Sequence, residues 1–388
     1  MIIQKFGIYD KIYQKHEDAA LKTYDPEFFS TAHLLKLAKE AQLSEENKKA
    51  ITDFMEYAGD DIKKFMWLFY YILFKSEEDF TTDIWQIDES RLPSVCEEKY
   101  PGMLKACIYL AAAENLREWL SARKLKGSGE MLEAFFDRYR YFVNLNLISH
   151  HTVGFCRLSP FLYAYGKPIA LKIGRLSYQL REFFDYHEVY EDENGKRIFA
   201  ALPWRKYNSE GLIDANGKTP FYQQTGDILK AHTYDNMGRL TPETTEVDLN
   251  KYKKILAPGD MVATIHIPGG GKLDPESVNR SLKDAKEILK REFPFVKAFV
   301  CRTWFIDPGL RSVFKEGANM LKFADMFDII STEDNENHSL FEHIFETVPC
   351  DLSELVPKND FQQKMLDRAK RGEKIYWSFG ILKKEYEK

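Results

Sequence analysis

The chain has 388 residues, 44% hydrophobic, 30% charged and 14% aromatic, which is enough for two or three domains with substantial cores. Its net charge of −5 excludes the broad basic field typical of proteins that bind nucleic acid or anionic membranes, and we expect neither partner. Five scattered cysteines without a CxxC pair argue against a structural zinc site or any other metal. Together with the absence of a signal-peptide core at the N-terminus, they predict a cytoplasmic protein.

Apolar residues three and four positions apart predict helices through roughly the first 148 residues. The predicted helical segments are 26–43, 47–58, 61–74, 101–125 and 130–148. The most apolar run, residues 65–74, is about half as long as a membrane span, so it predicts a buried helix. We therefore expect an all-helical N-terminal domain of residues 1–148.

The pattern changes beyond residue 149, where alternating aromatic and polar residues predict strands over 152–168 and 169–191. Turn signals follow at 193–196, 215–218 and 236–238, each of which contains a glycine. Antiparallel hairpins are therefore expected before residue 258. We assign residues 149–388 to a second domain of the α+β class, a mixed sheet with flanking helices.

From residue 258 the elements alternate. The predicted order is a strand at 261–267, a glycine loop, a helix at 277–293, a strand at 297–306, a short helix from Pro308, a strand at 320–330, a helix at 360–372 and a strand at 374–382. Asp274 and Pro275 are typical of the N-cap and the first position of a helix. This order predicts one β-α-β unit with three consecutive glycines at its turn.

Three phosphate-binding patterns compete for the glycine loop. The mononucleotide P-loop is excluded because His266 and Leu273 stand where a glycine and a hydroxyl residue are required. The dinucleotide fingerprint is excluded because Asp274 replaces its third glycine. Residues 266–271 match the third pattern, the acyl-CoA pyrophosphate loop of the GCN5-related N-acetyltransferase (GNAT) fold, except that His266 replaces Gln or Arg. A tight turn that binds nothing remains the alternative.

The similarity extends beyond the loop. His266 to Gly271, followed by Leu273 to Glu276, and Trp304 to Pro308 after the next strand, resemble two motifs of a bacterial acyltransferase-domain family. That family joins a helical N-acyltransferase N-terminal domain to a GNAT-like C-terminal domain. The resemblance covers roughly residues 150–330, and over the N-terminal half it rests on helical pattern and length.

The resemblance implies transfer of an acyl group from acetyl-CoA or another acyl-CoA to a small-molecule or peptide amine. The strand backbone at Thr264, Ile265, His266 and Ile267 would bind the pantetheine arm and polarise the thioester carbonyl. The pyrophosphate would then lie against the residues that follow, which are Gly269, Gly270, Gly271 and Lys272. The oligomeric state is left open between a monomer and a homodimer.

Three residues are candidates for the general base: His266, His232 and Asp307. Each has a structural alternative, since His266 could bond phosphate or backbone, His232 could lie on a hairpin surface, and Asp307 could cap the helix that Pro308 begins. The general acid is unassigned, because the segment 308–319 has no Tyr and Ser312 is its nearest hydroxyl. A non-catalytic acyl-CoA-binding or protein-interaction module therefore remains the alternative function.

Overall fold

The computed structural model describes residues 2–78, 92–125, 127–155, 159–183, 186–269, 271–334, 344–345 and 351–387. Contacts divide the chain into two compact units, Met1–Ile173 and Gly174–Lys388. The division lies later in the chain than the boundary predicted near residue 148. Helices continue past that residue, and α9, described below, packs on α7 and α8 of the first unit.

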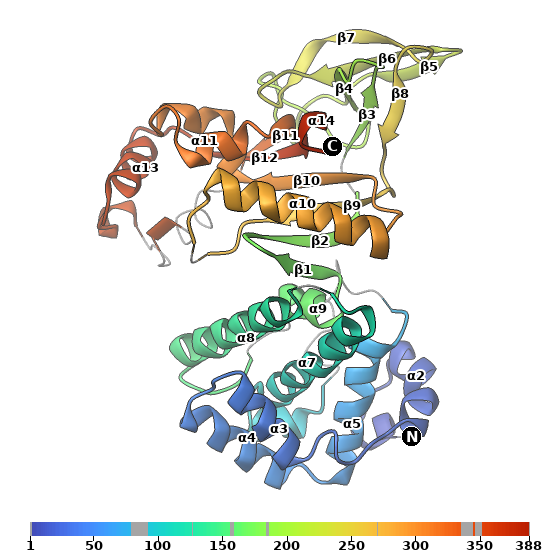
Figure 1. Cartoon of the computed structure of the whole chain (residues 1–388), viewed down its shortest axis with the longest axis vertical. Helices are drawn as coiled ribbons and strands as arrows, with labels where there is room; N and C mark the ends of the chain where they lie inside the picture. The colour runs from blue at the N-terminus through green and yellow to red at the C-terminus, as the bar shows by residue number, and fades with distance from the viewer. Residues whose placement is uncertain are drawn as a thin grey trace. The chain divides into compact units, whose positions relative to one another are not determined.

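The first unit is helical, as Figure 1 shows in blue and green. Its elements are α1 (Ile2–Lys5), α2 (Lys11–Lys22), α3 (Thr31–Glu40), α4 (Glu45–Tyr57), α5 (Asp60–Tyr70), the π-helix η1 (Tyr71–Lys75), α6 (Ser94–Lys99), α7 (Met103–Arg123), α8 (Ser128–His150), α9 (Pro160–Gly166) and the strand β1 (Ala170–Ile173). The first half of α7 is buried on every side, because its residues apart from the buried Lys105 are apolar and the helix contacts α3, α5, α8 and α9.

The prediction of a strand over 152–168 is wrong, because α9 forms within it. The Ser159 side chain caps this helix by accepting the Leu162 N–H, and Pro160 occupies its first turn. The aromatic residues that suggested a strand include Phe161, Tyr163 and Tyr165, which all belong to this helix. Gly166 ends α9 so close to α7 that an added Cβ would lie 2.9 Å from the Ala112 methyl carbon.

The second unit has the α+β architecture that the sequence predicts (Figure 1). Its strands are β2 (Leu176–Glu182), β3 (His187–Glu191), β4 (Arg197–Ala201), β5 (Tyr222–Thr225), β6 (Ile228–Tyr234), β7 (Leu240–Asp248), β8 (Lys253–Leu256), β9 (Met261–His266), β10 (Ala298–Thr303), β11 (Phe327–Asp334) and β12 (Tyr376–Leu382). Its helices are α10 (Pro275–Glu292), η4 (Trp304–Ile306), η5 (Pro308–Ser312), α11 (Asn319–Ala324), η6 (Leu352–Glu354), α13 (Asp360–Lys370) and α14 (Lys384–Glu387).

Two sheets organise this unit. Within it the main sheet runs β2-β9-β10-β12-β11, and only the central pair β9–β10 is parallel. The second sheet runs β5-β6-β4-β3-β8, with β7 paired to β6. Two predicted hairpin turns join its strands, with Gly195 and Gly238 at φ of +83° and +73°.

Helix α10 covers one face of the main sheet. Its buried residues recur at helical spacing: Val278, Ser281, Leu282, Ala285, Ile288 and Leu289. Ser281 Oγ accepts the Leu176 N–H at 3.2 Å and lies 2.9 Å from the Tyr178 hydroxyl, which joins α10 to β2. The opposite face packs against the second sheet through a buried cluster: Phe183, Val189, Leu256, Val262, Ala298, Val300, Ile330, Phe379 and Ile381.

The strand predicted over 320–330 is partly wrong. Asn319–Ala324 form α11, with the Lys322 N–H bonded to the Ala318 carbonyl, and β11 begins only at Phe327. Phe323 is the buried residue of this short helix and packs on Phe327, with ring centroids 5.2 Å apart. A helix of six residues is too short for periodicity to predict it.

Candidate functional site

The main sheet opens at its centre. Strands β9 and β10 are paired only from Val262–Ala298 to Thr264–Val300. Beyond this point β9 continues to His266 along β2, whereas β10 continues to Thr303 along β12. The ladder between them therefore ends while both strands run on, and we call the resulting gap the fork.

One backbone group in the fork has a side-chain partner. Cys301 Sγ lies 3.4 Å from the Ile265 carbonyl oxygen, where a backbone bond would otherwise form. Since the N–H and C=O of a strand residue point to the same side, the Ile265 N–H also faces the fork. Complete burial raises the pKa of Cys301, so this residue is a neutral thiol and a weak donor.

Arg175, in the turn that precedes β2, holds the glycine loop from one side. Its Nη1 donates to the Pro268 carbonyl at 2.8 Å, its Nη2 to that of Gly271 at 2.8 Å, and its Nε to that of Lys272 at 2.9 Å. Partial burial lowers the pKa of the guanidinium, while the nearby Asp274 raises it. An arginine remains charged throughout the working pH range, so one cation binds three loop carbonyls.

This arrangement determines where the loop N–H groups point. In a trans peptide the carbonyl and the N–H lie on opposite sides. The N–H groups of Gly269, Lys272 and Leu273 therefore point away from Arg175. None of the three donates a hydrogen bond within the described part of the chain. Backbone N–H groups of a glycine-rich turn that have no such partner are suited to an anion such as a phosphate.

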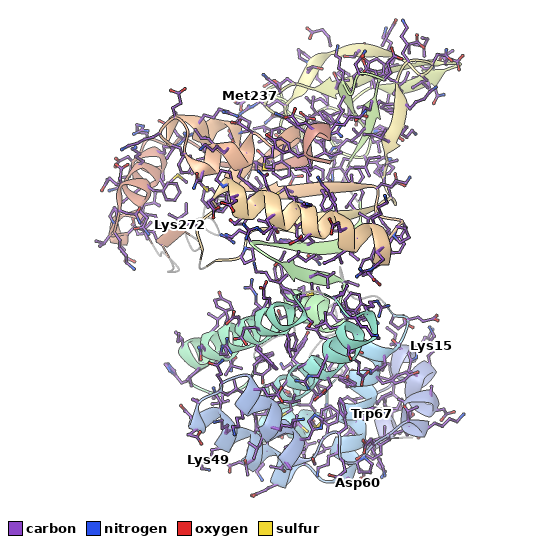
Figure 2. The ribbon with its side chains drawn as sticks, viewed as in Figure 1. Lys15, Lys49, Asp60, Trp67, Met237 and Lys272 are labelled. Carbon is purple, nitrogen blue, oxygen red and sulfur yellow. The ribbon has the colours of Figure 1, made fainter. Side chains whose placement is uncertain are left out.

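The helix that follows adds to the positive character of the loop. Asp274 caps α10 by accepting the Ser277 N–H at 2.9 Å, and Pro275 begins the helix, both as predicted. The N-terminal end of a helix favours anions. Lys272, labelled in Figure 2, is exposed just ahead of this end. Gly270, the central glycine of the prediction, lies outside the described residues.

The face of β2 and β9 opposite α10 carries a polar row. His266 Nε2 lies 3.0 Å from Gln179 Oε1, and the Arg181 Nε donates to Thr264 Oγ1 at 2.9 Å. Both pairs are diagonal neighbours across the antiparallel ladder. Thr264 is buried, whereas His266 is half-buried at the end of β9, where the glycine loop begins.

The other two candidate bases lie elsewhere in the second unit. His232, on β6, accepts the Phe221 N–H through Nδ1 at 2.7 Å and so holds the start of β5. Asp307 caps η5 by accepting the Gly309 N–H, and its second oxygen accepts the Tyr376 N–H at 3.0 Å. Burial raises the pKa of Asp307, and the two backbone donors lower it. Asp307 thus makes the capping contact that its alternative interpretation predicts, and His232 has a structural contact of its own.

His187 was not singled out from the sequence. It begins β3, is 1% exposed and packs against the rings of Phe183, Tyr234 and Phe379. Neither ring nitrogen has a hydrogen-bond partner among the described residues. Burial, and secondarily the charge of Arg302, lower its pKa to about 3. His187 is therefore a neutral imidazole at physiological pH, and nothing in its sequence context signals this.

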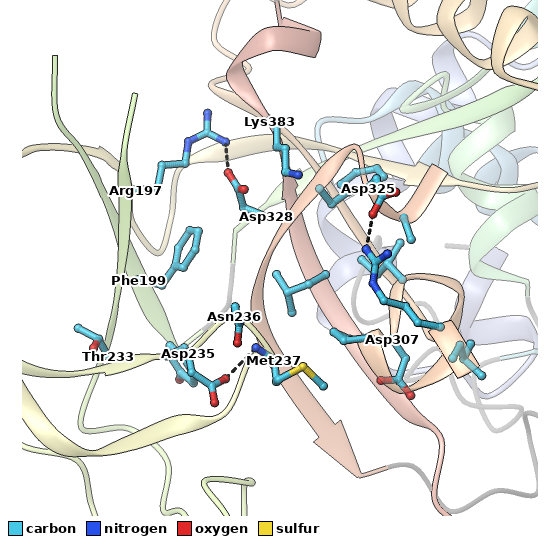
Figure 3. A pocket seen from close by; sticks show the side chains of 18 of the residues that line it. Arg197, Phe199, Thr233, Asp235, Asn236, Met237, Asp307, Asp325, Asp328 and Lys383 are labelled. Atoms are coloured by element: carbon cyan, nitrogen blue, oxygen red, sulfur yellow. Dashed lines mark hydrogen bonds and ion pairs between the residues drawn. The ribbon is translucent and has the colours of Figure 1, made fainter. Parts of the chain in front are cut away.

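A cavity of about 740 Å³ lies at the edge strand β11, bounded by the β4 and β6 strands, η4, η5 and α11. In Figure 3 Arg197 faces Asp328, with 3.4 Å between Nη1 and Oδ2. Its charged lining is balanced: Asp235, Asp307, Asp325 and Asp328 against Lys196, Arg197, Arg311 and Lys383. None of its lining residues belongs to β9 or the glycine loop, so this cavity and the predicted acyl-CoA site are different places.

Two further findings concern the described residues. No helix among them is long and apolar enough to cross a membrane. No group of three or more His, Cys, Asp and Glu side chains in the same ranges could hold a metal ion. The site is therefore characterised by its backbone fork, its glycine loop and the side chains around them.

Comparison with known proteins identifies the second unit. Residues 170–382 match the model of a family described as the GNAT-like C-terminal domain. A mutant acyltransferase crystallised with octanoyl-CoA is similar, with a TM-score of 0.55, 13% identity and coverage of 91% of this chain and 88% of the other. An acyltransferase in complex with decanoyl-CoA and teicoplanin has a TM-score of 0.48 at 14% identity, over 90% and 99% of the two chains. No curated protein matches.

Proposed function

The chain belongs to the GNAT-like C-terminal domain family, and on this premise we propose that it is an acyltransferase, which moves an acyl group from acyl-CoA to an amine. The observation that carries the proposal is the junction between β9 and α10. There the Gly269, Lys272 and Leu273 N–H groups point away from the half-buried guanidinium of Arg175, and the start of α10 follows directly in the chain. A diphosphate is the acyl-CoA group that matches such a site.

The fork suits the rest of the donor. A pantetheine arm contains two amides, which can bond a strand edge as another strand would. In the proposal this arm lies in the fork beside Ile265 and leads back to the diphosphate at the loop. The Ile265 N–H can then donate to the thioester carbonyl, where negative charge develops as the amine attacks.

The reaction forms a C–N bond and breaks the C–S bond of the thioester, and the attacking amine must lose a proton. His266 is our candidate for its acceptor. It lies at the end of β9, where the glycine loop begins, with its Nε2 3.0 Å from Gln179 Oε1. Asp307 and His232 are weaker candidates, since their acceptor atoms hold backbone N–H groups. The proton for the leaving thiolate has no assigned donor among this chain's residues.

The acyl chain length is a separate proposal. The sequence favours acetyl-CoA. The structural relative named above was crystallised with octanoyl-CoA, and its sequence is only 13% identical to that of this chain. A low-identity likeness concerns the fold, so we propose the acyl-CoA class, with acetyl to octanoyl donors to be compared directly. The acceptor is proposed as a small-molecule or peptide amine. A cytoplasmic location remains a prediction, and the oligomeric state stays open.

Isothermal titration with CoA and with acetyl- to octanoyl-CoA tests the proposal in the wild type and two matched variants. An added Cβ at Gly269 meets no atom within 4 Å, and its φ is not in the left-handed region, so both substitutions fit the fold. We expect Gly269→Ala to bind nearly as the wild type does. Gly269→Glu places a carboxylate beside the diphosphate and should weaken binding roughly a hundredfold or more.

The same titration distinguishes the alternative function. Wild-type binding that Gly269→Glu abolishes, together with release of free CoA thiol when a panel of amines is added, supports an acyltransferase. The same binding without thiol release for any donor would favour a non-catalytic acyl-CoA-binding module. A wild type that binds none of the donors would contradict both, and the glycine loop would be a turn alone.

A further inference from the structure

The glycine loop differs from the acyl-CoA pattern at one position, where His266 replaces Gln or Arg. The Nε2 of His266 is engaged with Gln179 on β2. The structure contains a basic side chain at the loop, and it comes from a distant part of the chain. Arg175 reaches the carbonyls of Pro268, Gly271 and Lys272 across about ninety residues of sequence, with separations of 93 to 97.

We propose that Arg175 is the positioning residue of this loop: it fixes three carbonyls on one side so that the N–H groups of Gly269, Lys272 and Leu273 are presented to the diphosphate of acyl-CoA on the other. The inference rests on the proposed function, because it names the diphosphate as the ligand. Glycine peptides flip easily, so without a partner for the carbonyls the loop would populate conformations with its N–H groups turned away.

The geometry of the guanidinium matters as well as its charge. All three of its nitrogens donate, each to a different carbonyl, at 2.8 to 2.9 Å. A lysine ammonium is a compact point charge on a flexible stem and cannot span three such acceptors in one plane. The substitution Arg175→Lys therefore retains the charge and removes the positioning. Arg175→Ala removes both.

The role predicts which ligands depend on Arg175. S-octanoylpantetheine has the acyl chain, the thioester and the pantetheine amides of octanoyl-CoA but lacks the diphosphate and the 3′-phosphoadenosine attached to it. We expect Arg175→Ala to raise the dissociation constant of octanoyl-CoA about ten- to a hundredfold, and Arg175→Lys to do nearly as much, as lost charge-assisted contacts and preorganisation imply. Both variants should bind S-octanoylpantetheine as the wild type does, within about twofold.

Isothermal titration of the full chain with the two thioesters measures this difference. Arg280→Ala is the matched control, because Arg280 is exposed on α10 and paired with Glu276 at 2.6 Å, without contact to the loop. It should leave both dissociation constants within about twofold of the wild type. The melting temperature of each variant without ligand shows whether the fold is retained.

Three results would overturn the inference. If Arg175→Ala binds octanoyl-CoA as tightly as the wild type does, Arg175 does not position the loop, although the proposed function stands. Equal loss of both thioesters would make Arg175 a general structural residue. Binding by Arg175→Lys at the wild-type level would leave charge, and not positioning, as its role. A wild type that binds neither thioester would instead refute the proposed function itself.

Discussion

His187 shows how burial controls the chemistry of one residue. Its ring packs against Phe183, Tyr234 and Phe379. The guanidinium of Arg302 is the charge that acts on its pKa. Both influences disfavour a second proton, so its pKa falls to about 3 in the folded protein. In the unfolded chain the pKa returns to about 6.5. Between about pH 3 and 6.5 the unfolded chain therefore binds a proton at His187 that the folded protein does not bind. This difference lowers the stability of the folded protein in that pH range.

The sign of the pH dependence follows. Above about pH 6.5, His187 does not lower the unfolding free energy. As the pH falls from about 6.5 toward 3, the unfolding free energy decreases, by at most on the order of 4 kcal/mol. His187→Phe keeps a ring of similar size and removes the titration. We expect urea unfolding between pH 7.5 and 4.5 to show a smaller loss of unfolding free energy in this variant.

At pH 7.5 the same variant should be as stable as the wild type or more stable by about 1–2 kcal/mol, because it removes two buried nitrogens without partners. His150→Gln is the control, since His150 is exposed and should leave the pH profile unchanged. Parallel profiles for His187→Phe and the wild type would contradict the neutral, buried imidazole.

The helix α10 and the strand β2 are joined by one hydroxyl. Ser281 Oγ accepts the Leu176 N–H and contacts the Tyr178 hydroxyl, and all three groups are buried. Ser281→Ala removes their common partner and should cost about 2–3 kcal/mol of unfolding free energy. Lys283→Ala, at an exposed position of the same helix, should cost less than about 0.5 kcal/mol.

A double-mutant cycle with Tyr178→Phe separates the free energy of this hydrogen bond from the other effects of the two substitutions. In the Ser281→Ala background the Tyr178 hydroxyl has lost its Ser281 partner, so removing the hydroxyl should cost less than it does in the wild type. We expect a coupling free energy of about 1 kcal/mol from urea denaturation of the four proteins. Strictly additive losses would mean that the two hydroxyls, although 2.9 Å apart, contribute independently.

Elements with strong local signals could be predicted from the sequence. The apolar run of β9, the glycines after it, and Asp274 with Pro275 at the start of α10 were all recognised in order, and the structure confirms the strand, the cap and the helix. Such signals lie within a few residues of each other. Short elements were predicted less well, since α9 and α11 have only seven and six residues, too few for periodicity to separate a helix from a strand.

The candidate site could be predicted only where it is contiguous. Residues 264–272 follow one another along the chain, and a pattern could identify them. Gln179, Arg181 and Arg175 reach the same segment from β2 and its turn, with separations of 83 to 97 residues. Their positions depend on the pairing of β2 with β9, which a single sequence does not specify.

At the scale of the whole molecule, the residues assigned to acyl-CoA all belong to the unit Gly174–Lys388. This unit has buried clusters of its own, one between its two sheets and one around Trp304, Leu310 and Met365. A unit with its own cores and its own site is expected to fold and bind ligand by itself. The family match begins at residue 170, which suggests this residue as the N-terminus of an isolated fragment.

We therefore expect the fragment 170–388 to bind CoA within about threefold of the full chain in isothermal titration, because no residue before 170 is assigned to the donor. Saturation at a hundred times the dissociation constant should stabilise the fragment by about 2.7 kcal/mol, as mass action requires for a ligand of the folded state. Arg175→Ala in the fragment is the control and should reduce both effects. A fragment that melts cooperatively yet does not bind CoA would contradict the prediction, because residues 1–169 would then supply part of the donor site.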